Sequence, residues 1–180
     1  MVLGPVVEKF HLDIKLSNPE ISSVDRILQD TVPTQTSTEN GVFLKTKNGE
    51  AQIADFTVPL VYLNKPFTIT KTNTGFTLSH TINEELIEYP GNIGTPTTID
   101  TPAGRIKLTV NALPSEGHVI SITKVSMPNA INALNSALSV AESGQKTGIL
   151  NLTLTGDGQE QISRILASII DSYVAQNLAR

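Results

Sequence analysis

The side chains that could do chemistry are few in this chain of 180 residues, and they are scattered along it. The three histidines are His11, His80 and His118, and none has a second histidine at the HxH or HxxxH spacing of paired metal ligands. Histidines placed in this way are far more often strand-face or surface residues than ligands. The sequence therefore predicts no metal site.

The densest group of carboxylates is formed by Glu84, Glu85 and Glu88. Two carboxyl groups can hydrolyse a glycosidic bond when one donates a proton and the other acts as base or nucleophile. Clefts that cleave or grip sugars usually also need aromatic platforms, whereas this chain has no Trp, five Phe and three Tyr. A solvated acidic turn is the better interpretation, and no catalytic residue is predicted.

The stretch Thr155–Glu160 resembles a calcium loop only distantly, because it lacks the alternating Asp and Asn ligands and the final bidentate Glu. Asp157 and Glu160 have the D-x-x-E spacing of a helix capping box, which explains them better. The chain has no nucleophile elbow, no phosphate-binding loop and no cysteine. The sequence therefore predicts a non-enzymatic chain without a cofactor.

The composition is that of a globular protein, with 39% hydrophobic and 17% charged residues. The net charge is −4 and the basic residues form no cluster, which argues against a nucleic-acid partner. No apolar run reaches the length of about 18 residues that a membrane-spanning helix needs, and the start lacks the pattern of a signal peptide.

The last third of the chain has the clearest pattern. Residues Ile149–Thr155 alternate between apolar and polar, which predicts a strand with Leu150, Leu152 and Leu154 on one face. After Asp157, the spacing of apolar residues predicts a helix with one apolar stripe, formed by Ile162, Ile165, Leu166, Ile169, Ile170, Val174 and Leu178.

A second helix is predicted ahead of this strand, between Ser126 and Gly144. Ser126 suits an N-terminal cap, Pro128 the first turn and Gly144 the position after the last turn. Steps of four and three residues place five apolar side chains on one face, namely Met127, Ile131, Leu134, Leu138 and Ala141.

From Gly41 to about Lys124 the sequence instead predicts seven or eight short strands. Thr, Val and Ile alternate there, and turn signals such as Asn48–Gly49 recur every eight to twelve residues or so. Residues Glu84–Tyr89 are compatible with either a short strand or a helical turn. The number and length of these strands favour an all-β insertion, either a sandwich or a jelly roll.

The predicted fold class is therefore α+β. A small α/β sandwich is expected from residues 1–40 and 126–180, and the β-rich insertion from residues 41–125. Strands at Leu12–Leu16 and Leu150–Leu154 are expected to share one sheet, covered by the terminal helices.

The same last third resembles a known family. The string Lys146-Thr-Gly-Ile-Leu-Asn-Leu-Thr-Leu-Thr-Gly156, then Ile162-Ser-Arg-Ile-Leu, then Tyr173-Val-Ala-Gln-Asn-Leu-Ala-Arg180, is similar to the periplasmic region of bacterial polysaccharide co-polymerases, the Wzz-type chain-length determinants. The resemblance is greatest to the Wzc-like tyrosine autokinases. It is specific from Ser126 to Arg180, extends to Met1–Leu16, and is weakest between these segments.

The resemblance implies an inner-membrane protein whose membrane spans lie outside this chain and whose periplasmic part forms the membrane-proximal α/β domain. Such a protein assembles into a homo-oligomeric ring and helps to set the length, polymerisation and export of capsular polysaccharide or exopolysaccharide. The implied partners are a polysaccharide polymerase, an outer-membrane export protein and the growing polymer. The autokinase activity would belong to a cytoplasmic domain, and this chain alone is expected to be a monomer.

A competing hypothesis makes the chain a carbohydrate-binding or adhesive β-sandwich module. The many short strands favour it and the missing Trp counts against it.

Overall fold

The computed structural model describes residues 2–19, 35–115, 118–142, 144, 150–156 and 159–178. The chain divides into two compact units. One unit, called the α unit below, comprises Met1–Asp13 with Ser126–Arg180, and the other, the β unit, comprises Ile14–Val125. The fold class is thus α+β, as predicted.

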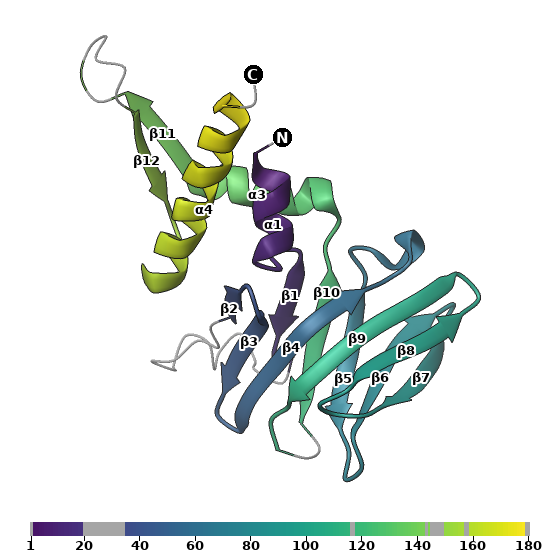
Figure 1. The fold of residues 1–180 in the computed structure, drawn as a ribbon. Coiled ribbons are helices and arrows are strands. Elements are labelled where there is room, and N and C mark those ends of the chain that lie inside the picture. The colour runs from purple at the N-terminus through teal and green to yellow at the C-terminus, as the bar shows by residue number, and fades with distance from the viewer. Residues whose placement is uncertain are drawn as a thin grey trace. The chain divides into compact units, whose positions relative to one another are not determined.

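The first sheet of the β unit has five antiparallel strands in the order β1-β10-β5-β6-β7 (Figure 1). Apolar and polar residues alternate along these strands, so that one face of the sheet is buried, as at Phe67 and Ile69. The strands are β1 (Ile14–Ser17), β10 (Val119–Lys124), β5 (Pro66–Lys71), β6 (Phe76–Ile82) and β7 (Glu85–Gly91).

The second sheet is also five-stranded and antiparallel, in the order β2-β3-β4-β9-β8. Its pairing shifts register twice between Gln52 and Asp55, where β4 and β9 are irregularly paired. The strands are β2 (Gln35–Thr38), β3 (Gly41–Thr46), β4 (Gly49–Thr57), β9 (Gly104–Ala112) and β8 (Pro96–Thr101).

The core of the β unit is one hydrophobic cluster that draws side chains from both sheets. The rings of Phe56 in β4 and Phe67 in β5 meet edge to face, with their centroids 5.9 Å apart. The side chain of Gln35 also joins β2 to β1, since its amide nitrogen donates to the Ile14 carbonyl and its oxygen accepts from the Leu16 N–H. It thereby satisfies backbone groups of an edge strand that has no further strand beside it among the described residues.

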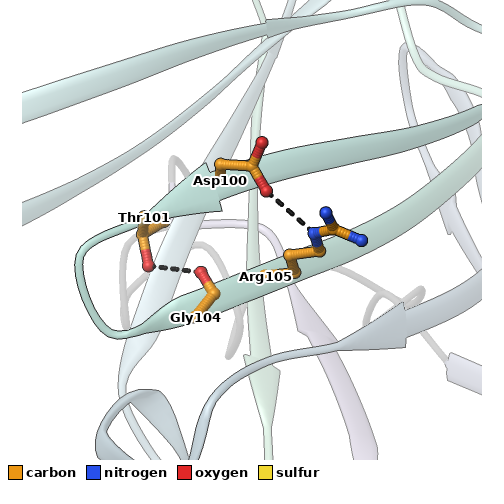
Figure 2. Close-up of polar contacts among 4 residues, drawn as sticks. All are labelled: Asp100, Thr101, Gly104 and Arg105. Carbon is orange, nitrogen blue, oxygen red and sulfur yellow. Dashed lines mark hydrogen bonds and ion pairs between the residues drawn. The ribbon is translucent and has the colours of Figure 1, made fainter.

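Three hairpin turns of the β unit share a T-x-x-G pattern. Figure 2 shows it between β8 and β9, where the Thr101 hydroxyl donates to the Gly104 carbonyl at 2.7 Å. An ion pair between Arg105 and Asp100, 3.0 Å from Nε to Oδ1, lies on the exposed face of the same hairpin. Gly104 has a φ of 135°, which favours glycine over any residue with a side chain. The same Thr-to-Gly hydrogen bond closes two other hairpins, Thr38–Gly41 and Thr46–Gly49.

The described residues of the α unit form three helices and a two-stranded antiparallel sheet (Figure 1). Helix α1 contacts both α3 and α4 and buries Val6 and Val7, while α4 buries Ile165 and Ile169. The elements are α1 (Leu3–Lys9), α3 (Met127–Ala137), β11 (Leu138–Glu142), β12 (Leu150–Leu154) and α4 (Gln159–Leu178).

The strand at Leu150–Leu154 and the helix after it are confirmed as β12 and α4. The capping residue predicted for that helix, Asp157, lies outside the described residues. The proposed common sheet is wrong. Strand β1 pairs with β10 in the β unit, whereas β12 pairs with β11 in the α unit.

The helix predicted from Ser126 to Gly144 is confirmed only as far as Ala137. Leu138 is extended, with a ψ of 127°, and the chain continues as β11. Leu138 pairs with Leu154, and Val140 pairs with Leu152, across the two strands. These cross-strand pairs stabilise a strand more than the helical spacing of the apolar residues stabilises a helix.

The compact β unit begins at Ile14, ahead of the boundary between residues 40 and 41 expected from the sequence. The strands β1 and β2 precede that boundary and pair with β10 and β3 of the β unit.

The segment Glu84–Tyr89, for which two structures were possible, lies largely in strand β7.

Candidate functional site

The β unit has an open hollow of about 650 Å³ next to one end of its first sheet. We call it the His80 groove. One wall is the segment around the short helix η1 (Leu60–Tyr62), and the opposite wall is the turn between β6 and β7. Its volume is in the range of ligand-binding clefts. The lining residues are Val61, Tyr62, Lys65, Pro66, Thr68, Ser79, His80, Thr81, Ile82, Asn83 and Leu86.

The imidazole of His80 lies in a cluster of aromatic rings and is only 8% exposed. It stacks on Phe67 with the ring centroids 4.5 Å apart, and its edge meets Tyr62 at 5.1 Å. Its Nε2 atom lies 3.3 Å from the Tyr89 hydroxyl, within hydrogen-bonding distance. These contacts hold the ring of His80, which belongs to β6, against β5, β7 and the η1 segment.

Burial lowers the pKa of His80, and the positive charge of Lys65 lowers it further. Burial also raises the pKa of the Tyr89 hydroxyl, with a smaller contribution from Tyr62. His80 is therefore uncharged at neutral pH, and Lys65 is the cationic group among the lining residues.

The two walls of the groove carry exposed apolar side chains beside charges of opposite sign. Val61 is 57% exposed and is followed by the exposed Lys65 on one wall. Leu86 is 60% exposed on the other wall, directly after the exposed Glu84 and Glu85. We call the side with Val61 and Lys65 the basic wall, and the side with Leu86 the acidic wall, because the exposed Glu84 and Glu85 border it.

The acidic wall is built on a tight turn, because Ile82 and Glu85 are paired across a two-residue loop. Both loop residues are left-handed, with a φ of 50° at Asn83 and 67° at Glu84. Turns of this kind strongly favour Asn followed by Gly. A glutamate at the second position is unusual, since a side chain there costs about 1–2 kcal/mol relative to an ordinary conformation.

The structure does not assemble the residue groups that could have indicated catalysis. Glu85 and Glu88 are three positions apart on β7, so their side chains leave opposite faces of the strand. His11 lies in the α unit, while His80 and His118 are in separate places in the β unit, His118 being 3.2 Å from the Asn48 side chain. Within the described ranges, no group of His, Asp and Glu could hold a metal ion.

The groove itself was missed by the sequence analysis. Its segments are separated in the chain and are brought together by the pairing of β5 with β6. One usable signal was present, since two adjacent apolar residues, Leu60 and Val61, precede Tyr62 in a segment without strand alternation.

The α unit has a smaller, almost entirely apolar hollow of about 320 Å³. It lies between the two-stranded sheet and the second half of α4, where Val140, Ile170, Tyr173 and Val174 are exposed. The other lining residues are Val2, Leu3, Asn135, Leu138, Leu152 and Ile169.

None of the helices that the structure describes is long and apolar enough to cross a bilayer.

Comparison with known proteins identifies the family. Residues 22–119 match the family model described as "Tyrosine-protein kinase Wzc, N-terminal domain". This match covers more than half of the chain, and the chain therefore belongs to the Wzc-like family that its last third resembles. The matched region is the N-terminal domain and not the kinase domain of these proteins.

Several curated relatives are tyrosine-protein kinases. The chain is 31% identical to tyrosine-protein kinase ptk of Acinetobacter johnsonii over 183 aligned residues, which cover all of the chain and 24% of that protein. It is 38% identical over 90 residues to tyrosine-protein kinase wzc of Salmonella typhimurium, covering 50% of the chain and 12% of the relative. A stretch of 51 residues is 49% identical to tyrosine-protein kinase etk of Escherichia coli K12, covering 28% of the chain and 7% of the relative. The chain thus spans a quarter or less of these proteins.

The family match falls within the β unit. The family model thus covers most of the region between Leu16 and Ser126, where the resemblance to the family is weakest. The β unit is therefore a regular part of this family's N-terminal domain.

Proposed function

We propose that this chain is the periplasmic scaffold and oligomerisation region of an inner-membrane polysaccharide co-polymerase. Such a protein regulates the chain length, polymerisation and export of capsular polysaccharide or exopolysaccharide. The observation that carries the proposal is the match of residues 22–119 to the N-terminal domain of the Wzc family. In this proposal the kinase activity belongs to another part of the full-length protein, and this chain contributes contacts.

The proposal places the chain between two membrane spans of the full-length protein, on the periplasmic side. Its partners are other copies of the same protein, a polysaccharide polymerase, an outer-membrane export protein and the growing polymer. Nucleic acid is not a partner, since the net charge is −4.

The two units have different roles in this proposal. The α unit is the membrane-proximal domain, because it contains Ser126–Arg180, whose sequence resembles the membrane-proximal α/β domain of the family. The β unit is an inserted domain, and its two five-stranded sheets form a sandwich related to a jelly roll. The support for this arrangement is the single hydrophobic cluster that takes side chains from both sheets.

The geometry supports a role in binding over a role in catalysis. The larger hollow combines exposed apolar and charged side chains, as at Val61 and Lys65, and the smaller hollow is almost entirely apolar. Surfaces of this kind make contacts with other macromolecules. The carbohydrate-binding module is not favoured as an alternative, because the family match describes the N-terminal domain of a tyrosine kinase.

The proposal is tested in the source bacterium by deleting the gene for the full-length protein and restoring it with or without residues 14–125. We expect deletion to abolish surface polysaccharide or change its length distribution on a gel, and the complete gene to restore it. The shortened gene should give a membrane protein that does not restore the distribution. An unchanged polysaccharide profile after deletion would overturn the proposal, as would a full-length sequence lacking two apolar runs of about 20 residues around this region.

A further inference from the structure

The exposed apolar side chains of the β unit are concentrated at one place. Among its described residues, the large apolar side chains that are strongly exposed are Leu60, Val61 and Leu86. Val61 and Leu86 both line the His80 groove, and Leu60 directly precedes Val61. Single exposed apolar residues need no explanation, but a cluster around a groove marks an interaction surface.

The charges around the groove identify the partner that this surface fits. Lys65 lines the groove together with Val61, and the exposed Glu84 and Glu85 lie in the chain between Asn83 and Leu86, which line its other side. The ion pairs described for the β unit do not include these three side chains. The surface therefore carries both members of a complementary pair, and another copy of the same chain presents the matching charges automatically.

We propose that the His80 groove is a contact surface between two copies of this chain, in which the basic wall of one copy meets the acidic wall of the next. This inference rests on the proposed function, since it gives a surface to the oligomerisation region. The apolar contacts are made by Leu60 and Val61 of one copy against Leu86 of the other. The charges fix which walls can meet.

The backbone of the acidic wall supports this role. Glu84 occupies a left-handed position that favours glycine, so its presence costs stability in the free chain. Strained residues of this kind persist where the surrounding structure or a function requires them. The negative charge of Glu84 at the tip of this turn, near Leu86, can pair with Lys65 of the neighbouring copy.

The size of the surface determines how strong the contact is. A stable interface buries about 1,200–2,000 Å² in total, which is far more than three apolar side chains and three charges can supply. The free chain is therefore a monomer at low concentration and associates only at high concentration. In the full-length protein, held in a membrane with other copies, the high effective concentration makes the same contact significant.

Charge reversal in the 180-residue chain tests the proposal, with self-association measured by sedimentation equilibrium up to millimolar concentrations. We expect Lys65→Glu to weaken association by at least about fivefold, and the double variant E84K/E85K to do the same. Combining all three reversals should restore it, because the charges again complement each other. Lys45→Glu, a reversal on the exposed surface of β3, is the matched control and should leave association unchanged. Equal effects of Lys65→Glu and Lys45→Glu, or no rescue by the triple variant, would overturn the proposal.

Disulfide trapping in the full-length protein separates this inference from the proposed function. The 180-residue chain contains no cysteine, so the introduced thiols are the only ones in this region. Two differently tagged copies are co-expressed, one with Lys65→Cys and the other with Glu84→Cys, and mild oxidation should join the two tags. The pair Lys45→Cys with Glu84→Cys is the control. An oligomeric protein without cross-links above this control contradicts the groove contact and leaves the proposed function standing, whereas a monomeric full-length protein contradicts both.

Discussion

The two units of this chain differ in how completely they bury their own apolar surface. In the β unit, side chains from both sheets form one closed cluster, with rings such as Phe56 and Phe67 fully buried. In the α unit, Val140, Tyr173 and Val174 remain exposed around an apolar hollow. The β unit therefore has the core of an independent domain, while the α unit leaves part of its apolar face to solvent.

This difference shows which contacts stabilise each unit. A five-stranded sheet with a buried face supports itself, whereas a two-stranded sheet such as β11–β12 is marginally stable without further packing. Among the described residues of the β unit, by contrast, the strongly exposed large apolar side chains are Leu60, Val61 and Leu86, of which Val61 and Leu86 line the His80 groove. Substitutions in the two units should accordingly have very different effects, and the following predictions test that expectation.

The largest effect is expected from Phe67→Ala in the β unit. The substitution removes a buried ring that contacts Phe56, Tyr62 and His80, and should lower the free energy of unfolding by about 3–5 kcal/mol. Urea unfolding followed by circular dichroism measures it. The comparison in the α unit is Tyr173→Ala, which removes a half-exposed ring and should change stability by less than about 1 kcal/mol. Equal losses would mean that the two units do not differ in burial.

Gly91→Ala should have the next largest effect. A Cβ atom at Gly91 would lie 2.2–2.7 Å from atoms of the Phe76 ring, which is itself buried, so the ring or the edge strand must move. We expect a loss of about 1–3 kcal/mol in the free energy of unfolding. The control in the α unit is Gly156→Ala, where the nearest atoms belong to Ile162 at an ordinary 3.8 Å. A loss in the control as large as that of Gly91→Ala would contradict this explanation.

The stability of the β unit should depend on pH through His80. The folded state lowers the pKa of His80 below its unfolded value of about 6.5, so protonation favours unfolding. The stabilisation that comes from His80 being neutral is complete above about pH 6.5 and is lost as the pH falls toward the pKa in the folded state. Over that range the free energy of unfolding changes by at most about 1.4 kcal/mol per pH unit.

Urea unfolding at a series of pH values between 5 and 8, for the original chain and for His80→Asn, checks this dependence. The variant should have a flatter profile in that range. A profile that is identical in both chains would show that His80 is not the group responsible.

The smallest effect is expected from Glu84→Gly. Glycine removes the steric cost of the left-handed φ of 67°, although it also increases the entropy of the unfolded chain. We expect the free energy of unfolding to rise by about 0.5–1 kcal/mol, measured by thermal and urea unfolding. Self-association should weaken at the same time, because the acidic wall loses a charge. A variant that is less stable than the original chain would contradict the interpretation of this turn.

The sequence predicted elements whose determinants are local. Strand β12 and helix α4 follow from the alternation of Leu150–Leu154 and the stripe that includes Ile165 and Ile169. Turns of the β unit follow from signals such as Asn48–Gly49, and the T-x-x-G spacing of three hairpins is an equally local signal.

Long-range pairing could not be predicted in the same way. The alternation at Leu12–Leu16 indicates a strand but does not say which strand will pair with it, and Ile14–Ser17 pairs with β10, more than a hundred residues away. Residues 138–142 have a helical spacing of apolar side chains, yet they form β11 because β12 is available as a partner. The His80 groove depends on such pairings, so its residues were not grouped in advance.

Hydrogen exchange of the backbone amides in the 180-residue chain, followed residue by residue by NMR, tests the difference between the two units most directly. We expect amides of the central strands β5 and β9 to exchange only through global unfolding of the β unit, and those of β11 and β12 to exchange orders of magnitude faster through local opening. Equal protection in the two sheets would contradict the account, because it would show that the α unit is as stable by itself as the β unit.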